Sequence, residues 1–183
     1  KIGAVTVAIS TFSTKRELMW TLKHSQSRCV ISISTIKNQN FIRLLKQLCP
    51  EYVSAEPGNL ANESLPNLKN IIAIEEYSDG AIIGWHDLRK ISVQTNITTL
   101  QNVQAKVERE EICFILYTSG STADPKGVML AHGNVITNGF YIGERQALSE
   151  LDRLWFAVPL FWSFGSANAL PAVITHGGCL ILQ

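Results

Sequence analysis

The chain has 183 residues, of which 46% are hydrophobic and 17% are charged, a balance typical of a chain that buries a core and not of a disordered one. Sixteen Lys and Arg residues against fifteen Asp and Glu residues give a formal net charge of +1. This balance excludes the strongly basic footprint of a nucleic-acid-binding protein, and it gives no electrostatic reason to bind a membrane surface.

Short apolar runs alternate with amphipathic ones in the first half of the chain. Residues 3–10 predict a buried strand because they are β-branched and uncharged. Thr14 and Glu17 have the spacing of a capping box, which predicts that a helix begins there. Further strands are predicted at residues 29–33 and 71–74, and a helix at residues 41–48.

The second half continues this alternation after two weaker stretches at residues 51–68 and 76–106, the latter leading into a short helix near residues 100–107. The remaining elements are strands at 112–117, 155–158 and 179–182, and helices at 134–148 and 165–174. Strands that alternate with helices predict βαβ units. We therefore expect an α/β fold with a largely parallel sheet flanked by helices.

Three further features limit the possible architectures. Residues 154–183 contain no charged side chain, but prolines and a glycine pair divide them into pieces too short to cross a bilayer, so we predict no transmembrane segment. Both ends of the chain fall in apolar runs, so we expect residues 1–183 to be part of a larger domain that is truncated at both ends. Gly139 and Gly143, four residues apart in a predicted helix, predict close helix packing.

The four cysteines are far apart in the sequence and form no CxxC pair or metal-ligand spacing. We predict buried thiols in a reducing compartment, and therefore a cytoplasmic protein without a cysteine metal site. His132, at the start of a predicted helix, is expected to make structural hydrogen bonds.

The stretch from Thr118 to Gly127 carries the strongest chemical signal. Hydroxyl side chains surround Gly120 directly after a predicted strand, and Lys126 follows. A glycine-containing turn lets backbone amides approach an anion, and a lysine adds a compact positive charge suited to phosphate. The order of residues predicts a triphosphate-binding loop, the alternative being an ordinary solvated loop.

Two common motifs do not fit this stretch. A Walker A loop requires glycine directly before the lysine, where this chain has Pro125. A nucleophile elbow requires a G-x-S-x-G pattern, which the residues after Gly120 lack.

Residues 117–128, YTSGSTADPKGV, resemble the phosphate-binding signature Y-T-S-G-[ST]-T-G-x-P-K-G-V of the AMP-forming acyl-CoA synthetases, adenylation domains and luciferases, with Ala123 in place of a glycine. Residues 130–134 and 159–165 resemble the L-[ST]-H-x-N and P-[LM]-[FY]-H-x-x-G segments of the same adenylate-forming superfamily, with Ala131 in place of the hydroxyl residue and Trp162 at the usual histidine. The resemblance spans nearly the whole chain and implies that it is part of the large N-terminal domain of such an enzyme.

This resemblance implies a two-step ligase. A carboxylic acid reacts with ATP in the presence of Mg²⁺ to give an acyl-adenylate, and a thiol of coenzyme A or of a carrier-protein pantetheine then takes the acyl group. Lys126 would be catalytic, and the residues implied to bind the phosphates are Thr118, Ser119, Gly120, Ser121, Thr122, Lys126 and Gly127. Phe161, Trp162 and Gly165 would line the acyl pocket, and the main Mg²⁺ ligand is expected outside this chain.

Two alternatives remain open from the sequence. The chain could belong to an adenylation domain that loads an amino or aryl acid onto a carrier protein. It could also belong to a non-catalytic, synthetase-derived binding protein.

Overall fold

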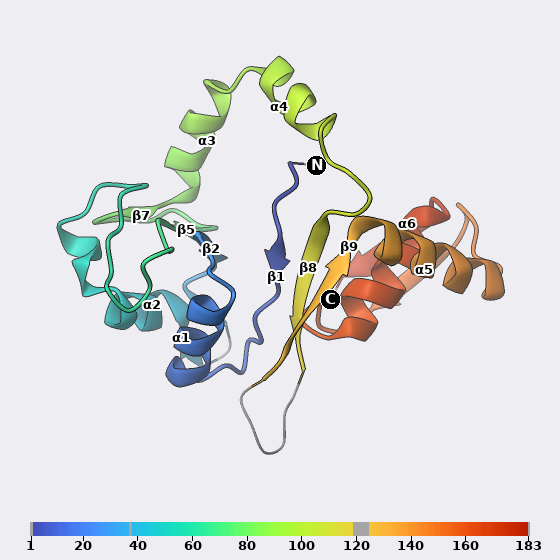
Figure 1. Ribbon diagram of the computed structural model, residues 1–183, viewed down its shortest axis with the longest axis horizontal. Helices are drawn as coiled ribbons and strands as arrows, with labels where there is room; N and C mark the ends of the chain where they lie inside the picture. Colours follow the sequence, from blue (N-terminus) through green and yellow to red (C-terminus); the bar gives the residue numbers. More distant parts are fainter. Residues whose placement is uncertain (1, 37, 119–124, 183) are drawn as a thin grey trace. The chain divides into compact units, whose positions relative to one another are not determined.

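The computed structural model describes residues 2–36, 38–118 and 125–182. The chain divides into two compact units (Figure 1). One comprises Ile9–Thr99, and the other combines Lys1–Ala8 with Leu100–Gln183.

A four-stranded sheet of order β2-β5-β7-β6 organises the unit Ile9–Thr99. The strands β2, β5 and β7 are parallel, and β6 pairs antiparallel with β7. The elements are α1 (Lys15–His24), β2 (Cys29–Ser32), β3 (Thr35–Ile36), β4 (Gln39–Asn40), α2 (Phe41–Leu48), the 3-10 helix η1 (Pro50–Val53), β5 (Asn70–Ala73), β6 (Ser78–Asp79), β7 (Ile82–Ile83) and α3 (Trp85–Val93). The helix α4 (Ile97–Gln104) spans the sequence boundary between the units.

The two helices before β5 begin where side chains satisfy their first amides. At α1, the Glu17 amide donates to Thr14 Oγ1 at 3.3 Å, and the Thr14 amide donates to Glu17 Oε2 at 2.7 Å. This is the capping box predicted from the sequence, and it is confirmed. At α2, the Asn40 side chain accepts a hydrogen bond from the Arg43 amide at 2.7 Å.

The core of this unit forms between α1, α2 and the sheet. Leu18 of α1, Ile42 of α2 and Ile71 of β5 are among its buried residues. Full burial of such a side chain contributes about 1.5–3 kcal/mol. The apolar residues at helical spacing along α1 and α2 therefore form the helix faces that pack in the core, as the sequence predicted.

The second unit contains two small sheets. One has the order β1-β8-β9, with β1 parallel and β9 antiparallel to β8, and the other is the parallel pair β10-β11. The elements are β1 (Thr6–Val7), β8 (Ile112–Tyr117), β9 (Gly127–Ala131), α5 (His132–Arg145), β10 (Arg153–Phe156), the π-helix η2 (Phe164–Ala169), α6 (Leu170–Thr175) and β11 (Cys179–Leu182).

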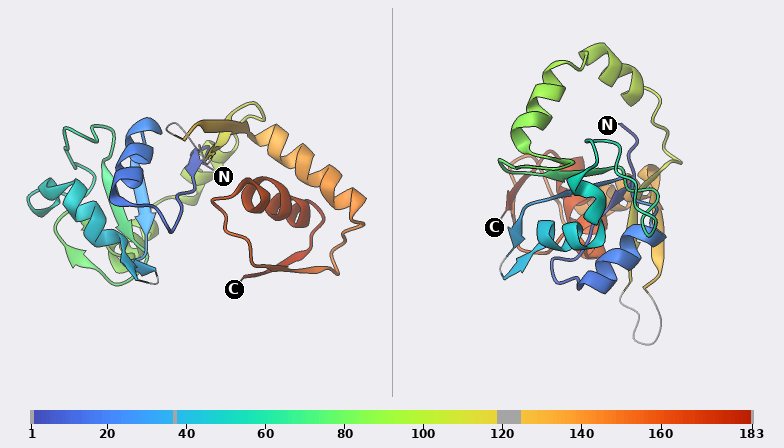
Figure 2. Two further views of the ribbon diagram at one scale, coloured as in Figure 1. Left: turned by 90° about the horizontal axis from the view of Figure 1, so that it is seen from below. Right: turned by 90° about the vertical axis from the view of Figure 1, so that its left-hand side faces the viewer.

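Helices α5 and α6 lie side by side because two glycines of α5 leave room for α6 (Figure 2). A Cβ at Gly139 would lie 2.6 Å from Pro171 Cβ, and one at Gly143 would lie 2.3 Å from the His176 ring. The close packing predicted for these glycines is confirmed.

The α/β fold class predicted from the sequence is confirmed, although the sheets are small and mixed. Strands β8 and β11 have the predicted bounds. Several elements differ from the prediction. The buried strand predicted at residues 3–10 is wrong, because β1 covers only Thr6–Val7 and is not buried, and β10 begins two residues before the predicted strand at 155–158. Strands β7 and β9 were not predicted, α3 lies in a stretch with no predicted helix, and α4 begins at Ile97. In the part of the chain that the structure describes, no helix is both long and apolar enough to cross a membrane.

The four cysteines are free thiols, as predicted, but only two of them are buried. Cys49 and Cys113 are buried, whereas Cys29 and Cys179 are exposed, so the prediction of buried thiols is wrong for those two. Burial, together with the negative charge of Glu51, raises the pKa of Cys49 to about 11. A thiol with this pKa stays protonated at neutral pH and is a poor nucleophile.

Candidate functional site

The strands β8 and β9 form an antiparallel hairpin that brings both ends of the predicted phosphate loop together. In the register, Tyr117 pairs with Gly127. Beyond this pair, the Thr118 amide donates a hydrogen bond to the Lys126 carbonyl at 3.0 Å. The predicted binding residues Ser119, Gly120, Ser121 and Thr122, and the unusual Ala123, lie outside the described residues.

Lys126 presents an exposed side chain at the end of this hairpin. No carboxylate among the described residues lies within ion-pair distance of its ammonium group. The neighbouring Pro125 is half-buried, so the main chain is partly packed while the lysine head is accessible. An accessible ammonium without a carboxylate partner is suited to binding an anion as a point charge.

Gly127 has a packing role that the sequence did not indicate. A Cβ at this position would lie 3.0 Å from Ile115 Cγ2 and 3.2 Å from Tyr117 Cε1. The glycine therefore lets neighbouring side chains of β8 pack against β9. Its predicted contact with phosphate stays a prediction.

Helix α5 starts directly after β9, and main-chain carbonyls satisfy its first amides. The His132 amide donates to the Glu111 carbonyl at 3.0 Å, and the Gly133 amide donates to the Arg109 carbonyl at 2.7 Å. The His132 ring nitrogen Nε2 is buried without a hydrogen-bond partner among the described residues. The structural role predicted for His132 is therefore carried by its main chain.

The predicted acyl-pocket residues meet in one turn before and within η2. Phe161 is half-buried and Trp162 is exposed, and their rings meet edge to face at a centroid distance of 5.8 Å. Gly165 is buried, and a Cβ there would lie 2.6 Å from the Pro159 carbonyl oxygen. Only glycine allows the chain to approach itself this closely, so Gly165 shapes the turn that carries both aromatic side chains.

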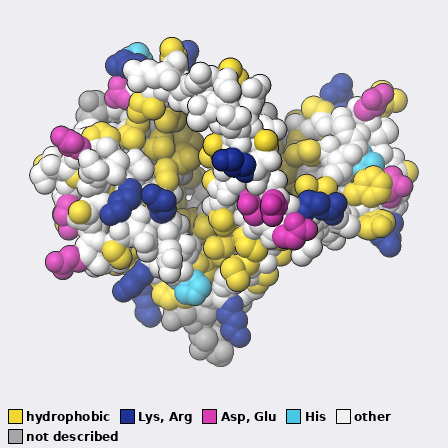
Figure 3. Space-filling model, turned by 45° about the horizontal axis from the view of Figure 1, so that its top comes forward, with side chains coloured by type: hydrophobic (Ala, Val, Ile, Leu, Met, Phe, Trp, Pro, Cys, Tyr) yellow, Lys and Arg dark blue, Asp and Glu magenta, His cyan; other side chains and the backbone are white. Residues whose placement is uncertain are grey.

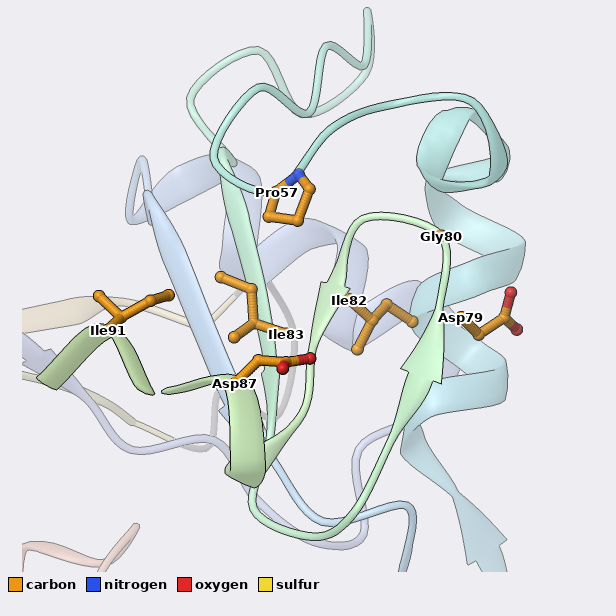
Figure 4. Close-up of a pocket in the computed structure, with 7 residues that line it drawn as sticks. All are labelled: Pro57, Asp79, Gly80, Ile82, Ile83, Asp87 and Ile91. Carbon is orange, nitrogen blue, oxygen red and sulfur yellow. The ribbon is translucent and has the colours of Figure 1, made fainter. Parts of the chain in front are cut away.

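A separate pocket of about 470 Å³ lies in the unit Ile9–Thr99 (Figure 4). Its lining combines apolar side chains with two carboxylates and consists of Pro57, Asp79, Gly80, Ile82, Ile83, Asp87 and Ile91. Asp79 pairs with Lys46, and Asp87 pairs with Lys90 at 3.1 Å. A lining whose charged groups are carboxylates disfavours a triphosphate, so this pocket is not the phosphate site.

Lys46 is engaged by its surroundings and is not a second anion-binding lysine. Its ammonium lies 4.9 Å from the ring centre of Tyr52 and 5.1 Å from that of Tyr77. Burial alone would lower the pKa of Lys46, but hydrogen bonds and charge attraction from Asp79 and Tyr77 outweigh it and raise that pKa above its ordinary value. We therefore assign Lys46 a structural role.

The described residues offer no ready site for a metal ion. Across residues 2–36, 38–118 and 125–182, no group of three or more His, Cys, Asp or Glu side chains could hold one.

Comparison with known proteins shows which family this chain resembles. The family described as AMP-binding enzyme matches residues 1–183. YngI of Bacillus subtilis (strain 168), which carries the name of an acyl-CoA synthetase, is 33% identical over 99% of this chain and 33% of its own length. The mitochondrial medium-chain acyl-CoA ligase ACSF2 of Bos taurus is 30% identical over 98% of this chain and 30% of its own length.

Solved structures agree on the fold. The crystal structure of the anthranilate CoA ligase AuaEII in complex with anthranoyl-AMP superposes with a TM-score of 0.72 at 23% identity, over 98% of this chain and 30% of that one. The N-terminal domain of FACL13 from Mycobacterium tuberculosis gives a TM-score of 0.63 at 20% identity, over 99% of this chain and 38% of that one. The chain thus spans about a third of the length of the curated relatives that it matches. On the match over its whole length, this chain belongs to the AMP-binding enzyme family.

Proposed function

We propose that the natural protein containing this chain is an ATP-dependent, AMP-forming ligase that joins a carboxylic acid to the thiol of coenzyme A. A carboxylate oxygen attacks the α-phosphorus of ATP, the bond to the β-phosphate oxygen breaks, and pyrophosphate leaves with the electron pair. The thiol sulfur then attacks the acyl carbon, and AMP leaves. The names of the two curated relatives, an acyl-CoA synthetase and an acyl-CoA ligase, support this proposal.

The observation that carries the proposal is the exposed Lys126 ammonium opposite Thr118 at the hairpin end. In the first step negative charge collects on the departing pyrophosphate. An ammonium that contacts the departing group stabilises this charge. We propose that Lys126 and Thr118 bind the β- and γ-phosphates together with Ser119, Gly120, Ser121, Thr122 and the main chain at Gly127.

The acyl group is assigned to the turn before η2. Phe161, Trp162 and Gly165 lie together there, and the two aromatic rings offer an apolar wall of the kind that a medium-chain or aryl acid would contact. Mg²⁺, when bound with ATP, supplies further charge neutralisation at the phosphates.

We include a cytoplasmic location in this proposal because the four cysteines are free thiols, the state typical of a reducing compartment. Several relatives are named as mitochondrial, so fractionation of cells into cytosol and mitochondria is the direct test. Recovery of the protein from mitochondria would overturn this part of the proposal.

The test of function is Lys126→Ala in the natural protein, with Lys106→Ala as the matched control. Lys106 is an exposed lysine of the same unit and lies outside the proposed site. Losing a charge-assisted phosphate contact worth about 1.5–3 kcal/mol should lower acid-dependent pyrophosphate release about ten- to hundredfold. The melting temperature should stay unchanged because the Lys126 side chain is exposed.

The measurement uses a panel of medium-chain and aryl acids, with coenzyme A or a pantetheine-carrying protein as the acceptor. Lys106→Ala and Lys126→Arg should retain most of the activity, because the first leaves the site intact and the second keeps the charge. Unchanged pyrophosphate release by Lys126→Ala would contradict the phosphate assignment. Acyl transfer only to the carrier protein would favour the adenylation-domain alternative.

A further inference from the structure

Asn138 of α5 reaches across to the π-helix η2 with both hydrogens of its amide group. Its Nδ2 donates to the Ala167 carbonyl at 3.0 Å and to Asn168 Oδ1 at 2.9 Å. An asparagine amide has two N–H donors, so this pair of contacts uses its full donor capacity. The two acceptors are adjacent, so a single side chain fixes the middle of η2 to α5.

The π-helical turn is itself unusual. In an α-helix each hydrogen bond joins residues four apart, whereas in a π-helix such as η2 it joins residues five apart. The π form is rare in proteins, but where it occurs it is often at a functional site. Because the π form is less favourable than an α-helix, it persists where contacts from the surrounding structure hold it. Asn138 provides such a contact from a different element.

A second set of bonds connects η2 to the aromatic segment. The Trp162 carbonyl accepts from the Gly165 amide at 3.0 Å, from the Ser166 amide at 3.1 Å and from Ser166 Oγ at 3.1 Å. Ser166 is almost completely buried, so this attachment is shielded from water. A change in the winding of η2 would therefore be transmitted to Trp162.

The side chains at the start of this segment are available to a ligand. Trp162 is 57% exposed and Phe164 is 58% exposed. One residue of register in a helix rotates the side chains before the change by about 100° relative to those after it. Conversion of η2 to an α-helix would therefore turn these rings away from their present directions.

We propose that Asn138 is a positioning residue that sets the acyl-chain selectivity of the ligase, by holding η2 in its π-helical form and thereby fixing Trp162, one of the two rings of the apolar wall, together with the neighbouring Phe164 ring. This inference rests on the proposed function, because it assumes that the wall contacts the acyl part of the carboxylic acid. Asn138 acts through the wall and touches no reacting atom.

The test compares three variants of the natural protein. Asn138→Ala removes both bonds to η2, and Asn168→Ala removes only the bond between the side chains. Thr137→Ala is the matched control, because Thr137 is an exposed neighbour on the same helix. Each variant is assayed for acid-dependent pyrophosphate release with a series of acids of increasing chain length, and for backbone hydrogen exchange across residues 164–170.

We expect Asn138→Ala to raise the KM for the preferred acid about three- to tenfold and to flatten the chain-length profile, as expected for the loss of two neutral hydrogen bonds. The KM for ATP should stay unchanged, and exchange across residues 164–170 should accelerate. Asn168→Ala should show a smaller shift in the same direction, and Thr137→Ala should show none. A merely structural contact between helices would lower the amount of active enzyme and leave both the KM and the profile unchanged.

The outcomes separate this inference from the proposed function. If the unsubstituted protein releases pyrophosphate with its acid but Asn138→Ala keeps the same acid KM and profile, the inference is overturned and the proposed function stands. If the unsubstituted protein releases no pyrophosphate with any acid, both are overturned. Unchanged hydrogen exchange across η2 in Asn138→Ala would also overturn the inference, whatever the activity.

Discussion

At the end of the β8–β9 hairpin the Lys126 side chain is exposed and a main-chain bond to Thr118 closes the ladder, whereas between α5 and α6 glycines bring the helices into contact with no room for a methyl group. Both regions belong to the same unit. Apolar side chains also remain at the protein surface, as one face of the molecule shows (Figure 3).

The difference between these regions separates function from stability. A group that binds an anion must stay accessible, so its loss removes little packing. A glycine under a neighbouring helix binds nothing, but a methyl group there must displace whatever lies against it. We expect substitutions in the hairpin to change activity at constant stability, and substitutions in the α5–α6 contact to do the reverse.

The largest expected effect on stability is that of Gly139→Ala. The new Cβ would lie 2.6 Å from Pro171 Cβ and 2.7 Å from the Pro171 carbonyl carbon, so the backbone of α6 must move. Overpacking costs about 1–3 kcal/mol, and a clash with backbone atoms falls in the upper half of that range, against a gain of about 1 kcal/mol from better helix propensity. We expect the free energy of unfolding to fall by about 1–2 kcal/mol in a denaturant titration.

Thr137→Ala again serves as the control, since it places the same residue type on an exposed position of α5. Its free energy of unfolding should be unchanged or slightly higher. A Gly139→Ala protein as stable as the unsubstituted one would mean that α5 and α6 adjust freely. The contrast between the two regions would then lose its basis.

Gly127→Ala in the β8–β9 hairpin should change the free energy of unfolding less than Gly139→Ala. Its Cβ would meet Ile115 Cγ2 at 3.0 Å and Tyr117 Cε1 at 3.2 Å, and both contacts are with side-chain atoms, none with the backbone. Alanine also gains about 0.5–1 kcal/mol over glycine in a strand, from the lower entropy of the unfolded chain. We expect these effects to cancel to within about 0.5 kcal/mol in the same titration. A loss as large as that of Gly139→Ala would show that the hairpin is packed as rigidly as the helices.

Local sequence signals account for much of the fold. The helix α2 and the strands β8 and β11 were predicted with the bounds that the structure shows, because their apolar spacing and their flanking residues both mark the same limits. Helix α1 was predicted from its capping box, which needs only residues three apart.

Most of the missed elements lack a buried face, whereas β7 is buried but only two residues long, too short to give a pattern. Helix α3 has no buried residue and no side-chain cap at Gly84, so neither periodicity nor capping marks it. Strand β9 is at most half-buried and gains its place by pairing with β8 across the loop. The four-strand order of the sheet in the unit Ile9–Thr99 likewise depends on pairings between residues far apart in the sequence. Short sequence patterns do not show which strands pair.

The candidate site divides in the same way. The sequence identified Lys126, Thr118 and the rest of the loop by the order of their residues, but not the main-chain hydrogen bond between Thr118 and Lys126 or the packing role of Gly127. Asn138 was missed entirely, because its acceptor Ala167 is far along the chain and only the fold brings them together. A polar residue in the middle of a glycine-containing helix was the only available signal.

The smallest expected effect belongs to the capping box of α1. It tests whether the exposed Glu17 carboxylate, hydrogen-bonded to Thr14, stabilises this chain. Hydrogen bonds from the Thr14 amide and hydroxyl lower the pKa of Glu17 below its ordinary value. A carboxyl group whose pKa is lowered by folding stabilises the protein above its unfolded pKa, and this stabilisation disappears as the pH falls through the folded pKa. Glu17→Gln keeps an oxygen that can accept from the Thr14 amide, so it removes only the charge.

Because Glu17 is exposed, Glu17→Gln should lower the free energy of unfolding at pH 7 by only about 0.2–0.5 kcal/mol, and its difference from the unsubstituted protein should vanish toward pH 3. Glu17→Ala, which removes the acceptor as well, should lose about 0.5–1 kcal/mol at pH 7 and keep part of that loss in acid. Denaturant titrations of the three proteins at pH 7 and at the lowest pH where they stay folded measure these differences. If Glu17→Gln kept the same deficit at both pH values, the charge would not be the source of the cap's pH dependence, and the depressed pKa of Glu17 would have no consequence for stability.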